Sequence, residues 1–323
     1  MKKSNILITG ATGFIGSHVA EALLNEQDYQ LIVIVRDKGS YKNTDRMNKR
    51  GAILFKGQFY DGSLLEGIFK AHPIDCVIHL AAMRGGGLGT AKEYMLINVL
   101  GTENLLNFSL KHRVRRFIFC SSVGVHGTVP TNCPANVGSP LNGDNHYHRS
   151  KIQAEDKVCE FVRKGLDAYI LRPTITYGPG HTGFPKILAS LVRKRMLLLP
   201  SNDIKIHLLN VLAFSQLLIK MIKTESLNQR IYIVADAEPI SLTELVNLIH
   251  FYYYKTEYPS WPKLPETLVR FLLKAFQFIQ NEKWVTRMLL LSRNWYYDIH
   301  ETLQAFRYVP VRTKDSFIKK LCD

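Results

Sequence analysis

A glycine-rich turn close to the N-terminus constrains the fold of this chain more than any other feature. The apolar run Ile6–Thr9 predicts a short buried strand, and a helical pattern follows from about Phe14 to Asn25. Between them stand three glycines, Gly10, Gly13 and Gly16. In such a strand–turn–helix unit the glycines permit the tight turn, the approach of a pyrophosphate to the backbone, and close helix packing. The helix N-terminus offers free N–H groups to phosphates. The turn therefore predicts a dinucleotide site.

The first half of the chain alternates short apolar runs with segments of helical pattern. Such runs are typical of strands that are buried on both faces of a parallel sheet, because crossover helices cover both faces. The expected strands after the first are Leu31–Val35, Ile53–Phe55, Cys76–Leu80, Arg116–Cys120 and Ala168–Leu171. The chain is therefore predicted to be an α/β protein with a Rossmann-like doubly wound parallel sheet.

The regular alternation of apolar runs and helical patterns ends after residue 172. Glycine and proline gather in residues 177–180, and the irregular segments lengthen. We expect residues 1–172 to form an NAD(P)-binding Rossmann domain. Residues 173–323 are expected to form mainly a smaller, mixed substrate-binding region. The apolar run Ile231–Ala235 is expected to return to the sheet as one more strand.

The end of the second predicted strand bears on which dinucleotide is bound. A carboxylate there accepts hydrogen bonds from the ribose hydroxyls and favours NAD, whereas an arginine pairs with the 2′-phosphate of NADP. Arg36 occupies the discriminating position, and Asp37 follows it. NADP is therefore favoured and NAD remains possible, since Arg36 could also be a solvated charge at the end of a strand.

A tyrosine and a lysine four residues apart form the expected catalytic pair. On a helix, Tyr147 and Lys151 lie on one face, one turn apart. A neighbouring cation favours the phenolate, so Lys151 is expected to lower the pKa of Tyr147. Ser122 follows a predicted strand and could hold the substrate oxygen or cap a turn. Asn98 could carry a water relay or pack its helix, and His79 is expected to be a hydrogen-bonded core residue.

The composition of the chain limits its possible binding partners and its cellular compartment. The net charge is +15, which favours an anionic ligand or surface. The basic residues are scattered, so no nucleic-acid partner is expected. Candidate contacts to a phosphate-bearing substrate, any of which could instead lie on a solvated helix face, are Arg172, Lys186, Arg193, Lys194 and Arg195. Five widely spaced cysteines without a CxxC pair, and no signal-peptide pattern, predict reduced thiols, no metal site and a cytoplasmic protein.

The motifs in their order resemble the extended short-chain dehydrogenase/reductase family, and within it the NAD-dependent epimerase/dehydratase group. They are TGATGFIG at 9–16, HLAA at 79–82, NVLGTEN at 98–104, SSVGVHG at 121–127, YHRSKIQAE at 147–155 and LRPTITYGPG at 171–180. Three positions depart from the family pattern. Gln58 and Asn210 stand where the family usually has aspartates, and His126 stands where it usually has a tyrosine.

The resemblance implies a Ser–Tyr–Lys active site. In it Tyr147 is the general acid/base, Lys151 is its electrostatic partner, and Ser122 binds the substrate oxygen. The cofactor contacts expected from the resemblance and from Arg36 are Gly10, Thr12, Gly13, Phe14, Ile15, Gly16, Arg36, Leu80, Ala81, Ala82, Asn98 and Lys151. A homodimer through the helices before and at Tyr147 is implied by the resemblance alone.

The resemblance also ranks the possible reactions. Sugar dehydratases of the family carry an Asp–Glu pair just after the active-site serine or threonine, whereas Val123 and Gly124 follow Ser122 here. A dehydratase is therefore disfavoured. The expected activity is that of an NAD(P)-dependent epimerase or ketoreductase, which transfers hydride at a carbinol or keto carbon of a nucleotide sugar. A hydroxysteroid- or dihydroflavonol-type reductase is the alternative. A non-catalytic NAD(P)-binding regulator is a distant one, because such relatives tend to lose the tyrosine–lysine pair.

The segment 264–291 is unusually apolar and supports the alternative reductase. Its wide helical stripe consists of Leu268, Leu272, Ala275, Phe276 and Ile279. The stripe could line an apolar pocket, lie on a membrane surface or cover the core of the smaller region. A lipid-linked nucleotide sugar as substrate, and peripheral membrane contact, are hypotheses drawn from this segment.

Overall fold

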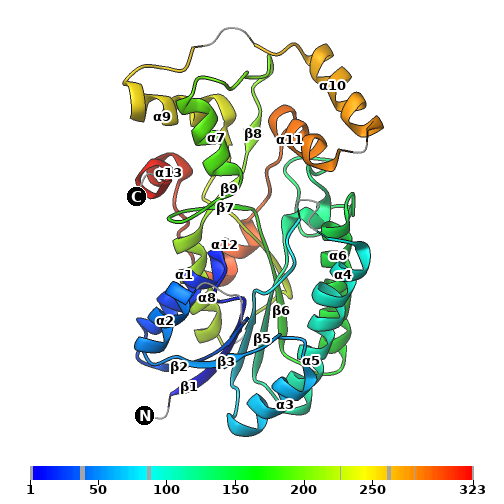
Figure 1. Cartoon of the computed structure of the whole chain (residues 1–323), viewed down its shortest axis with the longest axis vertical. Helices are drawn as coiled ribbons and strands as arrows, with labels where there is room; N and C mark the ends of the chain where they lie inside the picture. The colour runs from blue at the N-terminus through cyan, green and yellow to red at the C-terminus, as the bar shows by residue number, and fades with distance from the viewer. Residues whose placement is uncertain are drawn as a thin grey trace.

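The computed structural model describes residues 3–36, 41–85, 89–225, 227–259, 263–279 and 281–321. Its centre is a seven-stranded sheet in the order β10-β6-β5-β4-β1-β2-β3, in which all neighbours are parallel (Figure 1). The strands are β1 (Ser4–Thr9), β2 (Tyr29–Val35), β3 (Ile53–Lys56), β4 (Cys76–His79), β5 (Arg116–Cys120), β6 (Ala168–Pro173) and β10 (Ile231–Val234). Every predicted strand is present within two residues of its expected limits, so the Rossmann-like fold is confirmed.

Helices cover both faces of this sheet. On one face lie α1 (Phe14–Leu24), α2 (Tyr41–Lys49), α8 (Val211–Lys223) and α12 (His300–Phe306). On the other lie α3 (Gly62–Ala71), α5 (Gly101–Lys111) and α6 (His146–Arg163). A short helix, α4 (Ala91–Tyr94), runs through a π-helical turn, Met95–Leu100, into α5.

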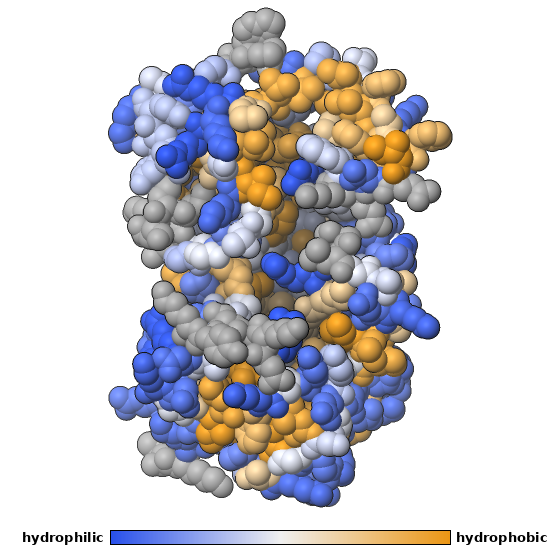
Figure 2. Space-filling view, in the orientation of Figure 1, coloured by the Kyte–Doolittle hydropathy of each residue, from blue (hydrophilic) through white to orange (hydrophobic). Residues whose placement is uncertain are grey.

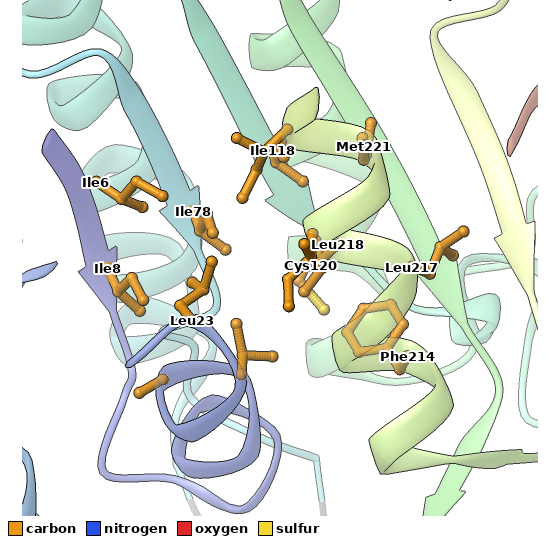
Figure 3. Close-up of a cluster of buried hydrophobic side chains, with 14 of the residues drawn as sticks. Ile6, Ile8, Leu23, Ile78, Ile118, Cys120, Phe214, Leu217, Leu218 and Met221 are labelled. Carbon is orange, nitrogen blue, oxygen red and sulfur yellow. The ribbon is translucent and has the colours of Figure 1, made fainter. Parts of the chain in front are cut away.

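The strands are apolar throughout because each side of the sheet has its own core. In β1, Ile6 and Ile8 face the core under α1 and α8, whereas Leu7 faces the core under α3 and α5. Figure 3 shows the first core, in which Leu23 of α1 and the labelled side chains of α8 belong to one cluster with the sheet residues Ile6, Ile8, Ile78, Ile118 and Cys120. Burial on both faces explains why the strands read as continuous apolar runs rather than as alternating ones.

The second half of the chain builds a smaller, mixed region and also returns to the sheet through α8, β10 and α12. In the smaller region β7 (Ile175–Tyr177) pairs with β9 (Leu208–Asn210), and β8 (Lys205–Ile206) pairs with β11 (Ile240–Ser241). Around them pack α7 (Phe184–Arg193), α9 (Leu242–Tyr254) and α13 (Thr313–Leu321).

Two further helices, α10 (Glu266–Phe278) and α11 (Glu282–Ser292), lie at the end of the molecule farthest from the N-terminus (Figure 1). They contain most of the apolar segment 264–291. Within the described residues, no helix is long and apolar enough to cross a membrane.

Candidate functional site

A cleft of about 1440 Å³ lies over the carboxyl ends of the sheet strands, between the sheet and the smaller region, and Figure 2 shows the hollowed face. In doubly wound folds this edge is where ligands bind. The cleft brings together every predicted catalytic and cofactor-binding residue except Asn98: Gly10, Thr12, Gly13, Phe14, Ile15, Gly16, Arg36, Leu80, Ala81, Ala82, Ser122, Tyr147 and Lys151.

The glycine turn forms one wall of this cleft, and its glycines are sterically required. Gly10 has φ +78°, and a Cβ there would lie 2.6 Å from the Ala81 backbone nitrogen. A Cβ on Gly16 would overlap the carbonyl of Gly10. Gly13 precedes α1 with no side-chain cap, so the first N–H groups of that helix stay available to a ligand. The turn therefore fits the pyrophosphate of a dinucleotide.

A buried hydrogen-bond chain fixes the strand ends beside the glycine turn. His79 Nδ1 is 2.6 Å from the Thr9 hydroxyl, and His79 Nε2 is 2.9 Å from the Thr102 hydroxyl. Thr9 also accepts the Ala81 N–H at 3.2 Å. Burial lowers the pKa of His79 to about 3, so the ring is neutral at working pH. The prediction of a packed, hydrogen-bonded histidine is confirmed.

Asn98 is buried in the π-helical turn and does not line the cleft. Its Oδ1 accepts the Met83 N–H at 2.7 Å, and its Nδ2 donates to the Met83 carbonyl at 3.0 Å. The same Nδ2 donates to the Ser150 hydroxyl at 2.9 Å. Asn98 thus ties the loop after β4 to α6, one turn from Tyr147.

The phenol of Tyr147 lies at the start of α6 and faces the cleft. Asn145 caps the helix by accepting the His148 N–H at 2.9 Å. Burial raises the pKa of Tyr147, and a hydrogen bond with the Ser122 side chain opposes that rise. This direction is opposite to the one expected from the sequence.

Burial of the phenol accounts for this direction, and the side chain of Lys151 makes contacts of its own. Its ammonium donates to the Cys120 carbonyl at 2.7 Å and lies 4.4 Å from the centre of the Phe119 ring. The ammonium is thus held by β5, while burial of the phenol is the largest cause of its raised pKa. Burial lowers the pKa of Lys151 itself to about 8, so it still carries most of a positive charge at neutral pH.

Two hydroxyls of the cleft were missed by the sequence reasoning. Ser121 Oγ and Thr174 Oγ1 are buried, line the cleft and have no hydrogen-bond partner. Buried polar atoms are rarely left unpaired, so both are open to a bound ligand. The sequence signal was weak, since Ser121 is the neighbour of Ser122 and serine is common in turns.

Besides Lys151, arginine side chains line the cleft. Arg84 is an exposed lining residue at the side of Tyr147 and His181. Burial, and then the positive charge of Arg84, lower the pKa of His181 to about 4. Arg36 also lines the cleft, as do Asn43 and Arg46. Asp37 lies outside the described residues.

The candidate phosphate contacts of the second half need correction. Arg172 is buried in an ion pair with Glu155, with its Nη2 2.6 Å from Oε2, and does not line the cleft. Of the other four candidates, Lys186 and the three basic residues 193–195 are exposed but also lie outside the lining. Arg172 is an anchor within the fold, because an unpaired charge at this depth would be strongly unfavourable.

The model of the NAD dependent epimerase/dehydratase family matches residues 6–212. The chain belongs to this family. The match covers the glycine turn, Ser122, Tyr147 and Lys151, and the resemblance inferred from the motifs is confirmed. The cleft is accordingly that of an NAD(P)-binding protein.

Relatives of this chain include nucleotide-sugar epimerases. A UDP-glucose 4-epimerase of Erwinia amylovora is 34% identical over 165 residues, which are 49% of this chain and 49% of the relative. One from Vibrio cholerae is 29% identical over 256 residues, with 76% and 74% coverage. The chain spans about half the length of the first curated relatives it matches.

The fold is shared with solved structures at low identity. One is the Bordetella bronchiseptica enzyme WbmG in complex with NAD and UDP, at 20% identity and a TM-score of 0.78, covering 99% of this chain and 94% of that one. At this identity the likeness concerns the fold.

Proposed function

We propose that this protein is an epimerase that oxidises and re-reduces a carbinol carbon of a nucleotide sugar with a bound NAD(P). The observation that carries the proposal is the single cleft in which the phenol of Tyr147, the Ser122 side chain and the Lys151 ammonium lie with the glycine turn. The UDP-glucose 4-epimerases among the relatives support the substrate class.

Tyr147 would act as the acid/base. The bound dinucleotide supplies the hydride acceptor and donor. The raised pKa of Tyr147 keeps the phenol protonated in the free protein, so it can donate to a keto oxygen. To accept a proton from a carbinol, the phenol must first ionise, and a cation close to its oxygen would favour the phenolate. Ser122, whose side chain lowers the pKa of Tyr147 against the effect of burial, would hold the same substrate oxygen.

The carboxylates of the cleft favour an epimerase over a dehydratase. Among the described lining residues the one carboxylate is that of Glu21, on α1. It is held by Arg46 at 3.0 Å and also by Arg50. Elimination of water from a keto sugar needs an acid and a base at the adjacent carbon, and no described carboxylate beside Ser122 can supply them.

The substrate is proposed to be a free nucleotide sugar rather than a lipid-linked one. None of the described residues in 264–291 lines the cleft. The apolar segment therefore adds no wall for a lipid chain or a steroid, and the reductase alternative loses its main support. Residues 173–184 supply the described lining from the second half of the chain, which supports a substrate-binding role for the region 173–323.

NADP is the proposed cofactor. Arg36 is an exposed guanidinium in the cleft beside Asn43, whereas Arg46 is already paired with Glu21. Replacing Arg36 by Asp should weaken NADP binding by at least about tenfold, since a charge-assisted pair is replaced by a repulsion, and should spare NAD. Isothermal titration with both dinucleotides measures this. If the variant lost equal affinity for NAD and for NADP, the proposed preference for NADP would be contradicted.

A homodimer is proposed through the outer face of the π-helical turn beside α6. Met95, Leu96 and Leu100 are exposed there, at 38%, 48% and 48%, and the turn packs on α6. A double Leu96→Ser, Leu100→Ser variant should be monomeric by light scattering while the parent is dimeric. A cytoplasmic location is also proposed, because the four described cysteines are all free thiols.

The proposed reaction is tested with a panel of nucleotide sugars and native mass spectrometry. An epimerase should retain its dinucleotide and interconvert epimers without net consumption of it, whereas a ketoreductase should exchange the cofactor and consume it. Tyr147→Phe should lower kcat by about 100-fold or more, while Tyr29→Phe, a matched change on β2 away from the cleft, should not. Full activity in Tyr147→Phe would contradict the assignment.

A further inference from the structure

Helix α10 carries two apolar stripes, and the protein covers only one of them. The inner stripe contains Val269, which is buried, and Phe276, which stacks on Trp284 of α11 at 5.6 Å. The outer stripe repeats at helical spacing as Leu268, Phe271, Ala275 and Phe278, and Ile279 follows it. Phe271 is 67% exposed and Phe278 is 89% exposed. Large side chains on a soluble surface are rarely left in water as a continuous stripe.

The outer stripe continues into a neighbouring segment. Leu264, just before α10, donates to the Leu199 carbonyl at 2.8 Å and pairs with Pro200 in a β-bridge. This places Leu198, which is 46% exposed, near the start of α10, and Met196, two residues earlier in the same segment, is 66% exposed. Figure 2 shows the resulting apolar area at the end of the molecule that carries α10. We call this surface, formed by Met196, Leu198, Leu268, Phe271, Ala275, Phe278 and Ile279, the apolar tip.

Basic side chains surround the apolar tip. The segments 191–200, 250–259 and 263–279 contain seven lysines and arginines and two glutamates. The exposed basic residues are Arg193, Lys194, Arg195, Lys255, Lys263, Arg270 and Lys274. One glutamate, Glu266, is already paired with Arg270 at 2.5 Å. The surface is therefore apolar with a cationic rim, and its occupant must tolerate both.

Aromatic side chains complete the rim. Residues 251–254 at the end of α9 are Phe-Tyr-Tyr-Tyr, and all four are exposed. Arg193 lies 5.4 Å from the Tyr253 ring centre, and Arg195 lies 4.3 Å from that of Tyr254. Exposed tyrosine rings next to arginines are typical of the boundary between lipid headgroups and acyl chains.

We propose that the apolar tip docks on the surface of an anionic lipid bilayer, with α10 lying in the headgroup–acyl boundary. A second copy of this chain fits the apolar tip less well than a bilayer does, because a symmetric contact would bring the two cationic rims together. A binding pocket on another protein also fits less well than a bilayer, since Phe271 and Phe278 protrude singly and do not line a groove. An amphipathic helix with basic flanks and exposed phenylalanines has the character of an interfacial membrane helix.

Flotation of the full chain with vesicles tests the proposal without relying on enzymatic turnover. Binding is expected to vesicles of phosphatidylcholine with 30% phosphatidylglycerol at low salt, and to be weak with phosphatidylcholine alone. A double Phe271→Ser, Phe278→Ser variant should bind about 100-fold more weakly, at roughly tenfold for each buried phenylalanine. Both side chains are so exposed that the variant should fold.

The matched control is Leu141→Ser with Val309→Ser, which removes exposed apolar side chains, at 47% and 87%, outside the apolar tip. It should bind as the parent does. A Lys263→Gln, Lys274→Gln variant should lose about tenfold to 25-fold in affinity for the anionic vesicles, at about threefold to fivefold for each charge removed. No binding to anionic vesicles at low salt would overturn the proposal. So would binding that the phenylalanine variant retains, or sedimentation showing that the phenylalanines drive self-association instead.

Discussion

Lys151 is a buried cation in the proposed active site, and its burial should be measurable as a pH-dependent stability. The side chain is only 2% exposed, and burial lowers its pKa from 10.5 to about 8. Because the folded state releases this proton at a lower pH than the unfolded state, the unfolded chain binds more protons between pH 8 and 10.5. Stability from this group must therefore rise with pH across that window.

The magnitude follows from the size of the pKa shift. The cost of keeping Lys151 charged in the fold is about 3 kcal/mol at pH 7.5 and about 1 kcal/mol at pH 10. Replacing Lys151 by methionine removes this cost. It also removes the hydrogen bond to the Cys120 carbonyl and the contact with the Phe119 ring. Those contacts are lost at both pH values, so they cancel when the two are compared.

The assay is urea unfolding of the parent and of Lys151→Met at pH 7.5 and pH 10. The parent should gain about 2 kcal/mol relative to the variant between the two pH values. Lys220→Met, which removes an exposed ammonium from α8, controls for the loss of one positive charge. A parent–variant difference that stays constant with pH would refute the reasoning, because it would mean that Lys151 is solvated like a surface lysine.

Three further outcomes are expected. Gly10→Ala should destabilise the protein by more than about 3 kcal/mol, whereas Gly51→Ala, also at positive φ but with open space around it, should cost about 1 kcal/mol in thermal or urea unfolding. Glu155→Gln should cost about 3 kcal/mol by leaving the buried Arg172 guanidinium short of a counter-charge; an effect as small as about 0.5 kcal/mol, typical of a surface pair, would contradict the burial argument. Ser121→Ala should leave stability unchanged or raise it by about 1 kcal/mol, because its hydroxyl is buried without a partner, yet should weaken NAD(P) binding in a fluorescence titration.

The positions of the strands and of the glycine turn were predictable because they depend on local patterns. A short apolar run reports burial on both faces, and it gives both limits of β5 and the end of β1 at Thr9, just before Gly10. The convergence of Gly10, Ser122 and Tyr147 on one cleft was also predictable, since parallel strands bring their carboxyl ends to one edge.

Partners that depend on tertiary contacts were not predictable. The sequence places Tyr147 and Lys151 one turn apart, but it does not reveal that the Cys120 carbonyl holds the ammonium. In the same way Arg172 was a candidate contact for the substrate or a solvated charge, because nothing local shows that it faces the α6 carboxylate of Glu155. Spacing along a helix therefore shows which side chains are neighbours on that helix. Their charge and pKa depend also on the groups of the neighbouring strands.

The buried ion pair between Arg172 and Glu155 supports the helix that carries Tyr147. It also contacts His126, the histidine that departs from the family pattern. Glu155 follows Tyr147 and Lys151 at four-residue intervals on α6, so Arg172 of β6 anchors the same helix face that carries the phenol. His126 lies with Nε2 3.2 Å from Arg172 Nη1 and with Nδ1 3.1 Å from the Pro140 carbonyl. If Nδ1 carries the proton, Nε2 is free to accept from the guanidinium. Burial and then the charge of Arg172 lower the pKa of His126, which keeps the ring in the neutral form that this arrangement requires.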